Sequence, residues 1–164
     1  MEKFEDSFSD HLEGFKSLNS AAIDASSIIY MQKAGFLHSA IVHIQLHSPI
    51  TVLDQTGFDL LQITSHDMKP YQQLSADQQL VNLAQNLSIP VISDDKWVLI
   101  KARAMGFPFY NSLMILNFLL YKRLVTLEFF DKYLHELITI ARYSQTVIQY
   151  GSTVTNEILT RIYC

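Results

Sequence analysis

The sequence predicts an α/β protein, a three-layer α/β/α sandwich with a short, mostly parallel sheet. Short apolar runs with the character of buried strands, at 21–23 and 89–92, alternate with longer stretches of helical periodicity. Such alternation is typical of parallel sheets that are covered by helices on both faces. Nearly half of the 164 residues are apolar, which is enough for a core in one domain.

Composition excludes some classes of protein. The net charge of −4 argues against a surface coated in phosphate contacts, although a local basic patch remains compatible with it. The only cysteine is Cys164, so no internal disulfide can form, which fits a reducing compartment. Residues 1–6 have neither the basic start nor the apolar run of a signal peptide. The longest apolar region, 107–121, is interrupted by polar residues and falls short of the roughly 20 residues of a membrane span. We expect a soluble, cytoplasmic protein with no membrane association.

Residues 1–19 are predicted to form an amphipathic helical extension to a domain at 20–164. Phe4, Phe8 and Leu12 lie at helical spacing with acids between them. This helix either packs on its own domain or serves as a docking or homodimer helix, and the sequence leaves both interpretations open.

The first strand, at 21–23, ends at Asp24, where a helix begins. A buried carboxylate is costly unless it is paired or holds a metal, and ligands of open α/β sheets bind at such strand ends. The alternative is that Asp24 only caps the next helix, which we weigh as the commoner case for this residue alone. That helix should end at Gly35.

The middle of the chain gives weaker signals. Residues 36–47 show helical spacing, with Pro49 as the predicted end. Residues 50–53 and 60–63 each read as a short strand, and Gly57 reads as a turn between them.

Clearer signals return at Ser75, which with Gln78 forms a capping box for a helix that extends to about Leu87. The strand at 89–92 is followed by a helix that Gly106 closes. Three more helices are predicted: one capped by Asn111, one capped by Thr126, and an amphipathic helix that includes 154–162.

Acidic residues follow two of the predicted strands. Asp24 ends the first, and Asp94 and Asp95 end the strand at 89–92, so a parallel sheet places all three at one edge. Asp77 shares a helix face with apolar residues three and seven positions further on, which points it inward. A first-turn acid also simply suits the helix dipole. Converging carboxylates without basic partners favour a hard divalent cation, Mg²⁺ or Mn²⁺.

No acid occurs from residue 96 to residue 127. Lys96, Ile100 and Arg103 share a helical face beside the predicted acidic edge. Cations beside an acidic metal pocket suit a polyanionic substrate, whereas a solvated helix face is the equally common alternative.

These residues in this order resemble the PIN-domain family, the ribonuclease fold of VapC-type toxins. The first motif of the family is similar to 23–29, its later acidic helix to 77–84, and its strand ending in Thr/Ser-x-Asp to 90–95. The stretch from Asn111 onward is similar to a subgroup of predicted nucleic-acid-binding PIN proteins. Each motif is weak alone, and the ordered set is moderately specific.

The resemblance implies a PIN-like sandwich that binds Mg²⁺ or Mn²⁺ and cuts single-stranded RNA. Its family acids carry over as Asp24, Asp77 and Asp95, with Asp94 a close competitor of Asp95. In this ribonuclease hypothesis Ser26 and Ser93 support the acids, and all four aspartates are metal-ligand candidates. Lys96 and Arg103, the cations of the acid-free stretch, would bind RNA. An antitoxin-like protein partner is implied as well.

One family acid is replaced. The Glu that the family places between the first two motifs falls on Gln55, which carries no charge, and Asp54 or Asp59 is a candidate substitute. The alternative function is therefore a degenerate, non-catalytic PIN-like module that binds nucleic acid or protein.

A third hypothesis is a zinc protein. His43 and His47 lie four residues apart in the helix predicted at 36–47, a spacing that can ligate a metal. His66 and Asp67 are the further ligand candidates. No Glu accompanies the two histidines as it does in the metalloprotease motif, so the alternative is that they are ordinary surface histidines.

Overall fold

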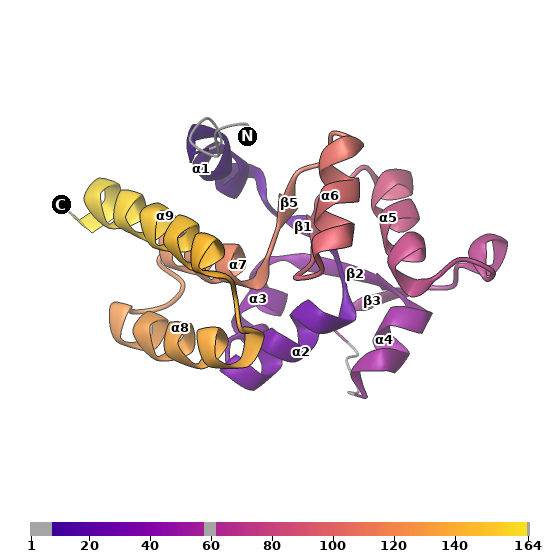
Figure 1. The fold of residues 1–164 in the computed structure, drawn as a ribbon, viewed down its shortest axis with the longest axis horizontal. Coiled ribbons are helices and arrows are strands. Elements are labelled where there is room, and N and C mark those ends of the chain that lie inside the picture. The colour runs from indigo at the N-terminus through magenta and orange to yellow at the C-terminus, as the bar shows by residue number, and fades with distance from the viewer. Residues whose placement is uncertain (1–7, 58–61, 164) are drawn as a thin grey trace.

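The computed structural model describes residues 8–57 and 62–163 and has an α/β architecture, as the sequence predicts (Figure 1). Five parallel strands form one sheet in the order β3-β2-β1-β4-β5. The strands are β1 (Ser20–Ile23), β2 (Gln45–Pro49), β3 (Thr64–His66), β4 (Val91–Ile92) and β5 (Phe109–Tyr110). Helices flank the sheet, consistent with a three-layer sandwich.

The strand order reverses direction at β1. The chain passes from β1 to β2 and β3 on one side, and β4 and β5 lie on the other. Ala22 of β1 therefore lies between His47 of β2 and Val91 of β4 in the register of the sheet. The carboxyl ends of strands on either side of such a reversal, here β1 and β4, are where open parallel sheets bind ligands.

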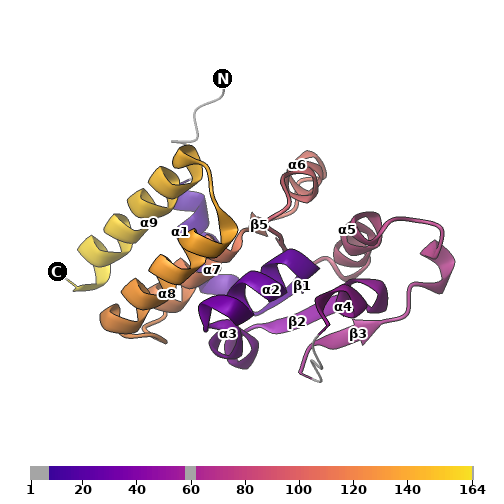
Figure 2. The same ribbon diagram turned by 60° about the horizontal axis from the view of Figure 1, so that its bottom comes forward.

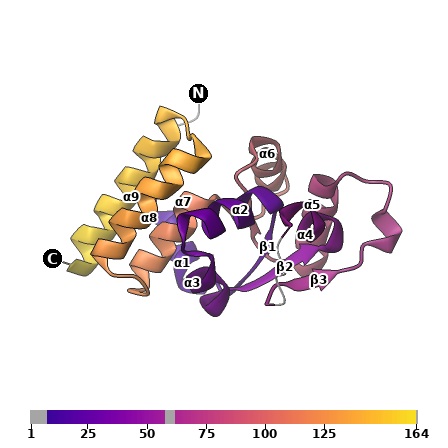
Figure 3. The same ribbon diagram turned by 90° about the horizontal axis from the view of Figure 1, so that it is seen from below.

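Helices cover the two faces unequally. One face carries α2 (Ala25–Ala34), α3 (Leu37–His43) and α7 (Ser112–Tyr121), and the other carries α5 (Ala76–Leu87) and α6 (Lys96–Ala104) (Figure 3). Each face of the sheet has its own hydrophobic core. Side chains of β1 point alternately to the two faces, so Ala21 and Ile23 lie in the larger core and Ala22 lies in the smaller one. The short helix α4 (Ile50–Thr56) follows β2 and packs on α2 and α5.

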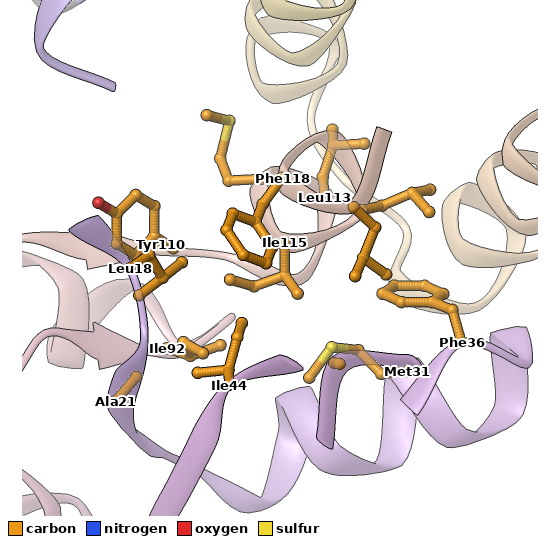
Figure 4. Packing of buried hydrophobic residues seen from close by; sticks show 14 of the residues in the cluster. Leu18, Ala21, Met31, Phe36, Ile44, Ile92, Tyr110, Leu113, Ile115 and Phe118 are labelled. Carbon is orange, nitrogen blue, oxygen red and sulfur yellow. The ribbon is translucent and has the colours of Figure 1, made fainter. Parts of the chain in front are cut away.

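The larger core is built around α7, whose sequence is apolar on nearly every side. Ile115 and Phe118 project from α7 toward Ile92 and Ile44, with Met31 of α2 beside them (Figure 4). All five side chains are at most 2% exposed. A helix that is hydrophobic all round is expected to be buried, as α7 is.

Three further helices enclose α7. They are α1 (Phe8–Ser17), α8 (Leu127–Ala141) and α9 (Gln145–Tyr163) (Figure 2). Helix α8 packs on α2 and α7, and α9 packs on α7. Phe15 of α1 is fully buried, and its ring contacts those of Tyr110, Phe118 and Tyr121. The N-terminal helix therefore packs on its own domain, which is one of the two interpretations that the sequence left open.

Two elements in the middle of the chain differ from the sequence prediction. The helix predicted at 36–47 ends at His43, and 45–49 is β2, because Gln45 and its neighbours pair with β1. The strand predicted at 50–53 is the start of α4, which begins directly after β2; Pro49, at its N-cap position, is in the extended conformation with φ −60° and ψ 146°. Gly57 ends α4 in the left-handed region, where glycine is favoured.

Where the sequence carries a cap, its predictions are confirmed. Gly35 ends α2 at φ 102°, and Ser75 with Gln78 forms both hydrogen bonds of a capping box. Asn111 and Thr126 cap α7 and α8. The strand predicted at 60–63 lies partly outside the described residues, and β3 begins at 64. Strand β5 was not predicted. In the described part of the chain, no helix is both long and apolar enough to cross a membrane.

Candidate acidic site at the carboxyl edge of the sheet

Asp24 lies at the carboxyl end of β1, as the sequence predicts, and is 4% exposed. It is the N-cap of α2: Oδ1 accepts the backbone N–H of Ser27 at 2.9 Å and the hydroxyl of Ser26 at 3.1 Å. Oδ2 accepts a hydrogen bond from the hydroxyl of Ser93, the residue that follows β4. Burial raises the pKa of Asp24 from 3.8 to about 6, although the hydrogen bonds from Ser93 and Ser27 act in the opposite direction. The nearby charge of Asp94 raises this pKa further.

Asp94 is held on both carboxylate oxygens. Oδ2 accepts the hydroxyl of Ser27 at 2.7 Å and the hydroxyl of Ser112, while the backbone N–H of Ser112 lies 3.2 Å from Oδ1. Oδ1 also accepts the hydroxyl of Tyr143 at 2.5 Å. Burial, together with this carboxylate, raises the pKa of Tyr143 above 10. Asp94 therefore joins α2, α7 and the linker between α8 and α9.

Ser93 connects the two strand ends. Its hydroxyl donates to Asp24 and accepts the backbone N–H of Asp95 at 3.0 Å. Asp95 in turn is the exposed N-cap of α6, and its Oδ1 accepts the backbone N–H groups of Trp97 at 2.8 Å and Val98 at 3.3 Å. The position of the Asp95 loop thus depends on the buried Asp24.

Asp77 lies in the first turn of α5 and is half-buried, on the same side as the buried Leu80 and Ala84. Partial burial and then the negative charge of Asp95 raise the pKa of Asp77 above its ordinary value. Asp77 and Asp95 form no ion pair with a described residue. Neither carboxylate is therefore neutralised by an ion pair among the described residues.

A shared feature explains how four acids coexist at one edge. Each lies at a helix N-terminus: Asp24 at α2, Asp77 at α5, Asp95 at α6 and Asp94 at α7. Backbone N–H groups and the positive end of the helix dipole stabilise carboxylates there. The capping and the functional interpretations of Asp24 are thus compatible, because the cap brings the charge to the edge.

The fit of a metal to this edge depends on which acids remain open. No group of three or more His, Cys, Asp or Glu side chains among residues 8–57 and 62–163 is arranged to hold a metal. Asp24 and Asp94 have donors on both oxygens. Asp77 and Asp95 remain as an uncompensated pair, and Mg²⁺ commonly takes only one or two carboxylates together with waters and substrate phosphates. The residues fit a cation shared with a substrate rather than a metal centre closed by protein ligands.

The position at which the sequence resemblance would require a further acid lies on α4. Gln55 and Asp54 are both exposed there, and Asp59 lies outside the described residues. Within α4, the hydroxyl of Thr51 donates to the side-chain oxygen of the buried Gln79 at 2.7 Å, a contact between uncharged groups. None of the described residues on α4 brings a carboxylate into the group formed by the other acids.

The predicted basic residues lie on α6, which begins at the acidic edge. Lys96 and Arg103 are exposed, and Ile100 between them is 55% exposed. The structure therefore places the first of these cations next to Asp95.

The histidines predicted to share a helix do not do so. His43 ends α3, whereas His47 lies in β2, so their four-residue spacing is not helical. His47 instead pairs across the sheet with His66, with 3.0 Å between Nδ1 and Nε2. Desolvation, followed by the charge of His66, lowers the pKa of His47. The i, i+4 zinc site of the third hypothesis is wrong.

Sequence reasoning missed the residues that hold Asp94. Ser27, Ser112 and Tyr143 come from three distant segments, and no local pattern links them. The only available signal was that Ser112 follows the predicted cap Asn111, which places its N–H at a helix start.

Comparison with protein-family models, curated proteins and solved structures finds no match to this chain.

Proposed function

We propose that this protein is a metal-dependent endoribonuclease that hydrolyses phosphodiester bonds of single-stranded RNA. The observation that carries the proposal is a pair of carboxylates on two helices that pack together. Asp77 lies in the first turn of α5 and Asp95 is the N-cap of α6, and the charge of Asp95 raises the pKa of Asp77. Uncompensated carboxylates at the edge of a basic helix suit a hard cation and a polyanionic substrate. The ordered resemblance to PIN domains adds to this argument.

In this proposal the residues have separate roles. Asp77 and Asp95 would hold Mg²⁺ or Mn²⁺ together with a substrate phosphate. The bound cation would stabilise charge on the phosphate and lower the pKa of a coordinated water. Asp24 is a positioning residue, because it acts on the Asp95 loop through Ser93. Lys96, which follows Asp95 directly, would bind a neighbouring phosphate.

Arg103 lies two turns further along α6 and would meet the RNA backbone farther from the scissile bond. Asp94 has no ligand role in the proposal, because its oxygens are engaged by hydroxyl and N–H donors. An antitoxin-like partner, a homodimer and a cytoplasmic location stay predictions from the sequence.

The test is manganese-dependent cleavage of single-stranded RNA by the wild type and by Asp77→Asn. This substitution removes a charge but no cap, because Ser75 caps α5. We expect cleavage to fall by at least about a hundredfold, the scale of losing an electrostatic catalytic group. The matched control is Asp131→Asn, an exposed acid on α8, which should cleave like the wild type. Equal cleavage by wild type and Asp77→Asn would refute the proposal.

A second candidate function, RNA or protein binding without cleavage, is favoured by one observation. Gln55 occupies the position of a family acid, and no three His, Cys, Asp or Glu side chains among the described residues are arranged to hold a metal. This candidate predicts no manganese binding by calorimetry at pH 7. A heat signal that is lost in Asp77→Asn would count against it.

A further inference from the structure

The sole tryptophan of the sequence stands beside the acidic edge. Trp97 is the second residue of α6, and its backbone N–H donates to Asp95. Its side chain is 40% exposed, whereas Val98 and Ala102 form the buried face of the same helix. The core packing of α6 therefore does not require an indole at this position, and its ring can offer an amphipathic contact area to a ligand.

A cation lies over this ring. Nζ of Lys101, one turn further along α6, lies 5.6 Å from the centroid of the Trp97 ring. Lys96 precedes Trp97 directly, and the acid-free stretch continues to residue 127. Ile100, on the next turn, extends the apolar part of this surface. The exposed side of α6 thus alternates aromatic or apolar groups with positive charges.

This alternation fits one kind of occupant. Single-stranded nucleic acid presents bases that stack on aromatic rings and phosphates that pair with adjacent cations. A purely apolar protein surface would leave the cations desolvated without partners. A duplex keeps its bases stacked within itself, so it offers phosphates but no free base face.

We infer that Trp97 is a stacking platform for one unpaired base, with Lys101 at the adjoining phosphate, and that α6 thereby selects single strands over duplexes. The inference rests on the proposed function, because it places this base next to the bond that Asp77 and Asp95 would address. It goes beyond that function by naming the residue that sets strand specificity.

The single tryptophan makes its own fluorescence the probe. Wild-type protein is titrated in EDTA with a short oligouridine, with a duplex of equal length and with an abasic phosphodiester of equal length. We expect saturable quenching by the oligouridine and little change with the other two, because only the first offers an unpaired base. Quenching of equal size by the abasic strand or the duplex would overturn the inference, as would oligouridine binding without quenching.

Variants are compared by the anisotropy of a labelled oligouridine. Stacking of one base contributes about 1–3 kcal/mol, so Trp97→Ala should bind roughly tenfold to a hundredfold more weakly. Trp97→Phe keeps a ring and should retain most of the affinity. The control is Phe129→Ala, which removes a 49% exposed ring on α8 and should bind like the wild type. Unchanged binding by Trp97→Ala would refute the inference.

The inference and the proposed function can fail separately. Binding that depends on Trp97 without manganese-dependent cleavage supports the platform and contradicts the nuclease. Cleavage whose KM and strand preference are the same in Trp97→Ala supports the nuclease and contradicts the platform. A protein that binds no oligonucleotide in either assay contradicts the platform, and the surface of α6 then serves another partner.

Discussion

The charge of Asp24 should make the protein less stable at neutral pH than in mild acid. The carboxylate is 4% exposed, and burial raises its pKa to about 6 in the folded state, against 3.8 for the ordinary side chain. Between these two values the folded protein binds a proton that the unfolded chain has already released. The free energy of unfolding therefore falls as pH rises through this window and is level above it.

The magnitude follows from the two pKa values. Their difference, at about 1.36 kcal/mol for each pH unit, corresponds to about 3 kcal/mol. About 2.5 kcal/mol of this should appear between pH 4 and pH 7, because the unfolded chain is already partly ionised at pH 4. Asp24→Asn removes the charge and keeps an N-cap of equal quality for α2. Its carbonyl can still accept the N–H of Ser27, and its amide can donate to Ser93.

The assay is urea unfolding of wild type and Asp24→Asn at pH 4, 5, 6 and 7. The difference in free energy of unfolding between Asp24→Asn and the wild type should shift by about 2.5 kcal/mol in favour of the variant from pH 4 to pH 7. This shift does not depend on which of the two proteins is more stable at pH 4. Asp54→Asn, at an exposed position on α4, serves as the control and should show no such gain. A difference between wild type and Asp24→Asn that stays constant with pH would refute the argument that burial holds this carboxyl protonated.

Two further predictions concern how α9 and its linker are joined to the core. Tyr143→Phe removes the hydroxyl that donates to Asp94, so we expect a loss of about 1.5–3 kcal/mol in urea unfolding at pH 7, the scale of hydrogen bonds to charged groups. An unchanged midpoint would mean that Asp94 does not need this donor. Gly151→Ala would bring a Cβ within 2.4 Å of Cδ2 and 2.9 Å of Cγ of Leu113, where α9 crosses α7. Overpacking of this kind costs about 1–3 kcal/mol, and a thermal unfolding midpoint at or above that of wild type would contradict the close contact.

The fold was predictable wherever the sequence carries local signals. Helix starts at Ser75, Asn111 and Thr126 are each marked by a side chain that accepts a hydrogen bond within its own first turn. The stretch 36–53 carries no such mark. Its apolar spacing fits a helix through Leu46, yet pairing with β1 makes 45–49 a strand, a tertiary effect that residue pattern alone does not reveal.

The site was predictable in position but not in its internal bonding. Strand ends fix where Asp24 and Asp95 lie, because parallel strands share one carboxyl edge. Which acid stays open is decided by distant partners: Asp94 is engaged by Tyr143, 49 residues away in the chain. The sequence offered Asp94 and Asp95 as near equals, and only three-dimensional contacts separate them.

The hydrogen bonds of Asp94 limit which parts of this domain can be exchanged with those of another protein. Helices α8 and α9 look like an addition to the sheet domain, but their linker supplies the tyrosine hydroxyl that completes the surroundings of a carboxylate on the β4–α6 loop. A chimaera that replaced the last two helices would leave that carboxylate short of a donor unless the new linker delivered a hydroxyl to the same place. The last two helices and their linker are thus part of the scaffold of the acidic edge.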